Sequence, residues 1–214
     1  MIRTLSQLPA SDDLVQLQNK TSCPYSKRAN LFYVEENGTK EISLAEANTA
    51  MKSFLQNQRQ KDVDILFMCF RHDHTHIDQL VDFFYHLMNG LFVAIENKSI
   101  ETLNFNDERS KIELDGVTFF ITVHSPIYAE SHSRHAFGCN TVIGFQPYES
   151  FARFKVLTSH QESVRKKFTR DGKPYAPSAV VDSQHELEKF IKPMDRDSPP
   201  IKWWIKRNKP GIHR

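Results

Sequence analysis

The run Val117-Thr-Phe-Phe-Ile-Thr-Val-His124 decides the expected fold, because its residues alternate in the way that a β-strand requires. One face of this strand would carry Val117, Phe119, Ile121 and Val123, and the other would carry Thr118, Phe120, Thr122 and His124. The first face is wholly apolar, whereas the second mixes polar groups with an aromatic ring. The stretch therefore predicts a strand with two distinct faces that ends on a histidine.

Other strands and helices are expected on both sides of this strand. Residues 63–70 are nearly all apolar, which is typical of a strand that is buried on both faces. Residues 77–91 place apolar side chains at helical spacing, with Thr75 as the expected N-cap and Gly90 as the expected end. Further elements are predicted as strands at 31–35 and 141–146, and as helices at 44–60 after a Ser43–Glu46 capping box, around Phe151, at 160–169, and from a capping box at Ser183 to Pro193.

The length and the composition of the chain predict a single folded domain. The 214 residues are 39% hydrophobic and 25% charged, as in ordinary globular proteins, and a typical domain has roughly 100–200 residues. Because the expected strands and helices are interspersed without strict βαβ alternation, we predict an α+β fold, or an α/β fold with a mixed sheet. We expect a polar N-terminal arm over residues 1–22, a single compact domain over 23–200 and a basic C-terminal tail over 201–214.

Several classes of protein are disfavoured by the sequence. No apolar run approaches the roughly 20 residues that cross a bilayer, and we expect no secretion because the polar start lacks an apolar signal core. The three cysteines, Cys23, Cys69 and Cys139, cannot all pair within one chain, which favours a reducing cytoplasm. Glycine-rich phosphate-binding motifs and the nucleophile elbow of serine hydrolases are absent from the sequence.

Three places in the sequence carry residues that are suited to chemistry. The first is the stretch 71–76, where His72, His74 and His76 could converge on one metal ion, since neutral imidazoles are common metal ligands. The alternative is a solvated loop between a strand and a helix. We prefer the loop, because Thr75 is well placed as a helix cap and bends the chain before His76.

The second place is the segment 124–137. A histidine at the end of an apolar strand, on the face that also holds Phe120, is well placed as an axial ligand of a planar cofactor. Arg134 could pair with a carboxylate of a cofactor or a substrate, and His135 follows in the same loop. The alternative is that a backbone carbonyl satisfies His124, and spacing alone favours that alternative.

The third place is the C-terminal tail, where Trp203 and Trp204 precede Lys206, Arg207 and Lys209. Basic residues beside aromatic rings can bind single-stranded nucleic acid through phosphate contacts and base stacking. The alternative is that both tryptophans dock the tail onto the core while the charges stay in water. We prefer docking and do not expect nucleic acid as a partner, because the net charge of the chain is only +2.

Several short motifs follow one another in an order that points to a known family. They are Cys23-Pro-Tyr-Ser-Lys-Arg-Ala29, the strand from Ile65 to Arg71 with the helix after it, the aromatic run Gly116 to Pro126 followed by Ser133-Arg134, Phe145-Gln-Pro-Tyr148 with Phe151, Val164-Arg165, and Gly172-Lys-Pro-Tyr175. In this order they resemble the YqcI/YcgG family of bacterial proteins. No single motif is specific, so the resemblance lies in their succession over most of residues 20–175.

This resemblance implies haem, because characterised relatives in the family are haem-dependent oxygenases that hydroxylate nitrogen in arginine or related amino acids. By resemblance, His124 is the expected iron ligand. His135 is a reserve ligand, because Ser125 interrupts the adjacent His-Pro pair of the family pattern. Arg134 would meet a haem propionate or the substrate carboxylate, and Glu130 would hold a substrate guanidinium.

The expected function is therefore a haem-dependent monooxygenase that hydroxylates a nitrogen of a small amine or amino acid and draws on a separate electron donor. Two alternatives stay open. One is a non-haem metal enzyme that uses the histidines of residues 72–76, and the other is a non-catalytic protein that binds a small molecule with the same fold. No membrane partner is expected.

Overall fold

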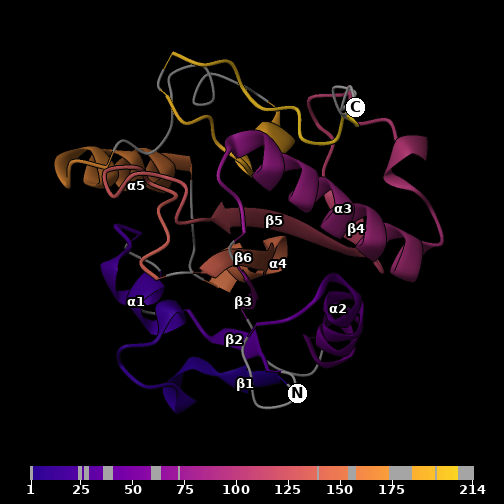
Figure 1. Ribbon diagram of the computed structural model, residues 1–214, viewed down its shortest axis with the longest axis horizontal. Helices are drawn as coiled ribbons and strands as arrows, with labels where there is room; N and C mark the ends of the chain where they lie inside the picture. Colours follow the sequence, from indigo (N-terminus) through magenta and orange to yellow (C-terminus); the bar gives the residue numbers. More distant parts are fainter. Residues whose placement is uncertain are drawn as a thin grey trace, which may run out of the picture.

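Six strands form one mixed sheet in the computed structural model, which describes residues 2–23, 26, 29–35, 41–58, 64–71, 73–138, 140–153, 158–173, 185–195 and 197–206 (Figure 1). The strands are β1 (Ile2–Thr4), β2 (Leu31–Val34), β3 (Ile65–Arg71), β4 (Ile112–Leu114), β5 (Val117–His124) and β6 (Asn140–Pro147). They lie in the order β1-β2-β3-β6-β5-β4. The pairing of β2 with β3 is parallel, and the other neighbouring pairs are antiparallel.

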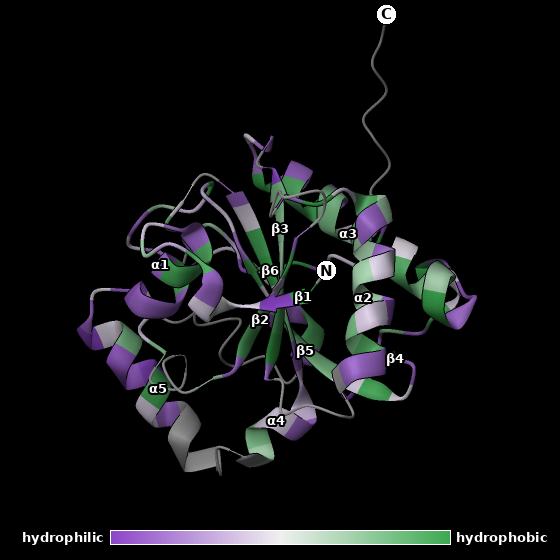
Figure 2. Ribbon diagram, turned by 90° about the horizontal axis from the view of Figure 1, so that it is seen from below, coloured by the Kyte–Doolittle hydropathy of each residue, from purple (hydrophilic) through white to green (hydrophobic). Residues whose placement is uncertain are grey.

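Helices cover both faces of this sheet. They are α1 (Asp13–Lys20), α2 (Leu44–Gln58), α3 (Ile77–Glu96), α4 (Tyr148–Arg153) and α5 (Thr158–Arg170), with a 3₁₀ helix, η4, at Glu186–Lys189. Figure 2 shows the sheet nearly edge-on, with α1 and α5 on one side of it and α2 and α3 on the other. This arrangement confirms the prediction of a single α+β domain with a mixed sheet. Within the described residues, no helix is both long and apolar enough to pass through a membrane.

The larger hydrophobic core lies between the sheet and the helices α2 and α3. The side chains of Phe119, Ile121 and Val123 are completely buried in it, whereas the side chains of the opposite face of β5 are half-buried. The burial of the two faces of β5 therefore matches the alternation of the sequence. The predicted capping box also forms at the start of α2, where the Ser43 N–H donates to the Glu46 carboxylate over 2.6 Å.

A smaller hydrophobic cluster lies on the other face of the sheet, beneath α1. Leu14 and Leu17 of α1 pack there against Leu31 and Phe67 of the sheet. Residues 1–22, predicted as a polar arm, therefore contribute an edge strand, β1, and the helix that covers this face. The polar sequence hides this role because only two side chains of α1 are buried.

Helix α3 differs from its sequence-based bounds at both ends. It begins after His76, not Thr75, because the Gln79 side chain accepts hydrogen bonds from the backbone N–H of Thr75 (2.6 Å) and of His76 (3.2 Å). The helix then runs through Gly90 and ends at Asn97, whose φ of 54° lies in the left-handed region. The predictions of Thr75 as N-cap and of Gly90 as the end are therefore wrong.

The C-terminal segment contains less helix than predicted. Only η4 forms between Glu186 and Lys189, while Ser183 lies outside the described residues. The Leu187 carbonyl accepts hydrogen bonds from the Phe190 N–H (3.3 Å) and from the indole N–H of Trp203 (2.9 Å). Trp203 is fully buried and Trp204 is 9% exposed, which confirms that the tryptophan pair docks onto the core.

Gly144 in β6 allows two side chains to approach each other over the sheet. A Cβ at this position would lie 2.7 Å from a ring carbon of Phe67 and 2.8 Å from the hydroxyl of Thr122. We expect Gly144→Ala to lower the free energy of unfolding by about 1–3 kcal/mol, because the central strands cannot separate to admit the methyl group. Urea denaturation measures this change.

Gly90→Ala is the matched control, because an added Cβ there lies 3.7 Å from its nearest neighbour, the Asn48 side chain. In the interior of α3 this substitution should raise stability by about 0.5–1 kcal/mol. Equal effects of the same sign at Gly144 and Gly90 would contradict the close approach of Phe67 and Thr122.

Candidate functional site

A cavity of about 420 Å³ opens on the face of the sheet that carries His124. Small-molecule sites typically measure about 300–1,000 Å³. The floor of the cavity comes from β2, β3, β5 and β6. Its walls come from α1, α4, α5, the loop after β5 and the segment that contains η4. The cavity is thus built from segments that lie far apart in the sequence.

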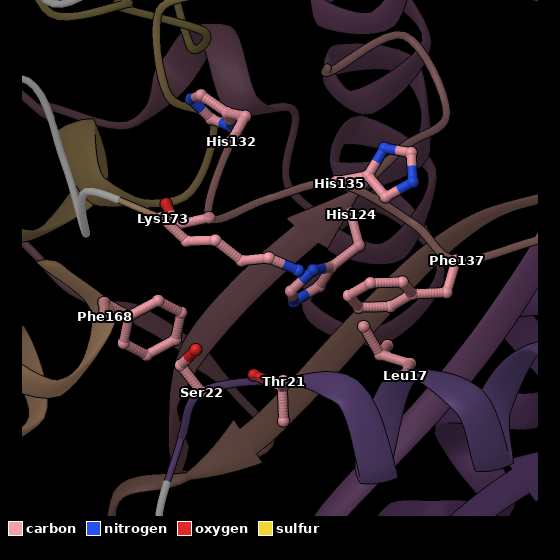
Figure 3. Close-up of a pocket in the computed structure, with 10 residues that line it drawn as sticks. Leu17, Thr21, Ser22, His124, His132, His135, Phe137, Phe168 and Lys173 are labelled. Atoms are coloured by element: carbon pink, nitrogen blue, oxygen red, sulfur yellow. The ribbon is translucent and has the colours of Figure 1, made fainter. Parts of the chain in front are cut away.

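His124 ends β5 at one side of this cavity. A smaller recess adjoins the cavity, and the two share Leu17, Thr21, His124, Ser133 and Phe168. Figure 3 shows the His124 ring pointing into the recess between α1 and Phe168. His132 and His135 also line this recess, but neither of them lines the larger cavity. Of these three histidines, His124 is the one that lines both the recess and the cavity.

The electrostatic surroundings keep His124 neutral. The pKa of His124 lies well below its usual value because the ring is desolvated, and the positive charges of Arg134 and Lys192 lower it further. Its buried Nδ1 atom has no hydrogen-bond partner among the described residues. A backbone hydrogen bond with His135 acts on this pKa in the opposite direction and raises it. The alternative of a backbone partner for the His124 ring is therefore supported, although no described group bonds to its Nδ1. A neutral imidazole with an unused nitrogen is the form that binds a metal.

The loop after β5 is fixed by backbone hydrogen bonds that bring Arg134 to the cavity. The Ser125 N–H donates to the Arg134 carbonyl over 3.0 Å, and the Ala136 N–H donates to the Ser125 carbonyl over 3.2 Å. The Ser125 hydroxyl is fully buried and lies 3.2 Å from the Thr141 hydroxyl. The residue that interrupts the family's His-Pro pair therefore anchors the loop to β6.

His132 and His135 are held by the loop itself. The His132 ring stacks on Tyr128 with centroids 4.3 Å apart. Its Nδ1 accepts the Arg134 N–H (3.1 Å), so its Nε2 carries the proton and donates to the Pro193 carbonyl (3.2 Å). The Nδ1 of His135 lies 2.7 Å from the Tyr128 carbonyl oxygen, and its ring lines the recess but not the larger cavity.

The burial of His132 predicts a loss of stability in acid. Burial and the charges of Lys192 and Arg134 lower the pKa of His132 to about 4. The unfolded chain therefore takes up this proton first as the pH falls below the usual value near 6.5. The contribution is present above pH 6.5 and lost below it, so the free energy of unfolding should fall by about 2 kcal/mol between pH 7 and pH 5.

Urea denaturation of the wild type and of His132→Gln at these two pH values measures the effect, because glutamine cannot titrate there. His124 titrates in the same direction, so some pH dependence should remain in the variant. An unchanged slope in His132→Gln would contradict this assignment.

Aromatic side chains form part of the cavity surface. Phe120, on the half-buried face of β5, lies 6.1 Å from Phe151 and 6.0 Å from Phe190, measured between ring centroids. Phe67 and Phe168 also line the cavity. The structure thus places Phe120 in the cavity with His124, as predicted from their shared face.

Charged side chains occupy the rest of the wall. Arg134, Arg165, Lys189 and Lys192 supply positive charge. Glu186 is the acidic group among the described lining residues, and its carboxylate accepts hydrogen bonds from Tyr148 (3.0 Å) and Lys189 (2.6 Å). Burial raises the pKa of the Tyr148 hydroxyl, and the charge of Glu186 and the hydrogen bond to it raise this pKa further.

The sequence reasoning missed most of these wall residues. Arg165 and Tyr148 fall within the family-like motifs, so a signal for them existed. Glu186 and Lys192 had no such signal, because nothing in their local sequence shows that their segment folds back over β5. Glu130, by contrast, is exposed in the loop and does not line the cavity.

The histidines of residues 71–76 lie apart from this cavity. His74 packs on Phe83 with centroids 5.0 Å apart, and His76 is exposed at the start of α3. His72 lies outside the described residues. In the described part of the chain, no group of three or more histidine, cysteine, aspartate or glutamate side chains is arranged to hold a metal ion.

Comparison with known proteins identifies the family. The model of the YqcI/YcgG family matches residues 20–197, which include every element from β2 to η4. The chain therefore belongs to the YqcI/YcgG family, and the resemblance seen in its motifs is confirmed. No curated protein and no solved structure matches the chain.

Proposed function

We propose that this member of the YqcI/YcgG family is a haem-dependent monooxygenase that hydroxylates a nitrogen of a small amine or amino acid of the arginine type. The observation that carries the proposal is His124, whose neutral ring faces a recess and has a buried Nδ1 without a hydrogen-bond partner among the described residues. Such a ring is suited to bind iron. The adjoining cavity of about 420 Å³ supplies space beside this ring.

The other cavity residues fit the same cofactor. Phe120 and Phe67 offer apolar surface to a planar macrocycle, and Arg134 offers a guanidinium to a carboxylate at its edge. When bound, haem would supply the activation of O₂ with electrons from a separate donor. Such a donor is expected in a reducing cytoplasm, which is where we place the reaction.

Glu186 takes the role in substrate binding that the sequence assigned to Glu130. Its carboxylate lines the cavity, is oriented by Tyr148 and Lys189, and keeps further lone pairs for a guanidinium or ammonium group. Gln146 also lines the cavity and offers an amide to a polar substrate. These side chains would hold the substrate nitrogen in a fixed position while the aromatic wall excludes water.

Purified protein made with adequate iron tests the proposal. It should show a strong haem absorption band and should convert an arginine-type substrate, with O₂ and a reductant, into an N-hydroxylated product detected by mass spectrometry. A colourless protein that also fails to bind added haemin would refute the proposal.

Glu186→Gln should lower kcat/KM by about 10–100-fold, since a hydrogen bond to a charged group contributes about 1.5–3 kcal/mol. Glu130→Gln is the matched control and should leave kcat/KM unchanged, because Glu130 is exposed outside the cavity. The opposite result for the two variants would return the substrate-binding role to Glu130.

A further inference from the structure

A pair of buried cations lies next to His124 in the cavity wall. The Lys192 side chain is 1% exposed and the Arg134 side chain is 5% exposed, and both line the cavity. The Lys192 ammonium donates to the Ser133 hydroxyl over 3.1 Å, and an Arg134 guanidinium N–H donates to the Lys189 carbonyl over 3.1 Å. These two side chains are therefore held in place by the loop and by the η4 segment.

The burial of two like charges at one place is costly for the folded protein. Desolvation lowers the pKa of Lys192 well below its usual value, and the charges of Arg134 and Arg165 lower it further. The basic side chains of the described lining are Arg134, Arg165, Lys189 and Lys192. Glu186, the acidic side chain of the described lining, is already engaged by Lys189 and Tyr148. The described wall of the cavity thus carries an excess of positive charge.

The neighbouring surface indicates what kind of anion would fit. Part of the sheet floor of the same cavity is apolar, with Leu31, Ile65 and Phe67 in the lining. A strongly hydrated anion such as phosphate would lose water against this floor without compensation. A carboxylate attached to an apolar or planar molecule fits both the cationic wall and the apolar floor. A guanidinium forms a bidentate pair with the carboxylate, and the rest of the molecule covers the floor.

We propose that Lys192, Arg134 and Arg165 form a carboxylate-binding subsite in this cavity, with Lys192 as its buried centre. The carboxylate comes either from the substrate or from a propionate of the haem. Whether the carboxylate belongs to the substrate or to haem depends on the function proposed above. The subsite itself does not depend on that function, since it binds a carboxylate without haem.

Benzoate and its neutral isostere benzamide test the subsite on the haem-free protein. Isothermal titration should show that benzoate binds at least tenfold more tightly than benzamide. Lys192→Met should abolish this preference for benzoate. It should also raise the midpoint of thermal unfolding in the absence of ligand, because methionine has a similar volume to lysine but buries no charge. Lys202→Met, at an exposed position of the same segment, should change neither property. If Lys192→Met fails to fold, Arg165→Gln on the half-buried side of α5 replaces it.

Haemin and haemin dimethyl ester distinguish the two sources. If propionates use the subsite, Lys192→Met weakens haemin binding at least tenfold but leaves the ester unaffected. If the substrate uses it, both forms bind the variant normally and the amino-acid substrate binds at least tenfold more weakly. Both results support the subsite. Equal binding of benzoate and benzamide to the wild-type protein would overturn it, and this result would leave haem binding at His124 standing.

Discussion

His124→Ala is expected to lose haem: the absorption band of the wild type should disappear, and affinity for added haemin should fall by more than about 100-fold. Loss of a residue that merely supports a metal ligand typically costs about 10–100-fold in affinity, and loss of the ligand itself costs more. His132 and His135 are poor replacements for the ring, because His132 has both nitrogens engaged and His135 is held at the Tyr128 carbonyl outside the cavity. Absorption titration with haemin measures the effect.

His135→Ala is the matched control, because His135 lies in the same loop and lines the recess without facing the cavity. It should keep the haem band. His124→Gly adds a positive test, since free imidazole can enter the space left by the ring and should restore the band. Loss of the band in His135→Ala, together with its retention in His124→Ala, would transfer the ligand role to His135.

The local features of the fold could be predicted because they depend on short-range patterns. The alternation in β5 and the helical spacing of α3 report burial directly, and both elements form where expected. The ends of α3 were harder, because a glutamine side chain and an asparagine in the left-handed region set them. Strand order could not be predicted, since β6 pairs with β3 across more than 60 residues of chain.

The residues of the candidate site also fall into those that short-range patterns reveal and those that only tertiary contacts bring together. His124 and Phe120 could be found because they share one face of one strand, and Arg134 because it follows that strand closely. Lys192 and Glu186 come from a segment whose place over β5 depends on tertiary contacts, including the 3.4 Å hydrogen bond from the Val123 N–H to the Phe190 carbonyl. Glu130 illustrates the converse, because closeness in sequence to Arg134 does not bring it into the cavity.

Trp203 connects this segment to the core and explains how Lys192 and Glu186 stay in position. Its indole is fully buried, lies 4.7 Å from the ring of Phe84 in α3, and lies 6.0 Å from the ring of Phe190, measured between centroids. Its N–H also donates to the Leu187 carbonyl in η4 over 2.9 Å. The same side chain therefore packs against α3 and fixes the turn that carries the cavity wall.

Trp203→Ala should lower the free energy of unfolding by about 3–5 kcal/mol, because it leaves a large cavity in the core and removes one of the two hydrogen bonds to the Leu187 carbonyl. Urea denaturation measures this loss. Trp203→Phe separates the two causes, since it keeps apolar packing but removes the hydrogen bond, and should cost about 0.5–1.5 kcal/mol. If the cavity wall depends on Trp203, folded Trp203→Phe should also bind benzoate more weakly than the wild type. A Trp203→Ala protein as stable as the wild type would contradict the docking of the tail.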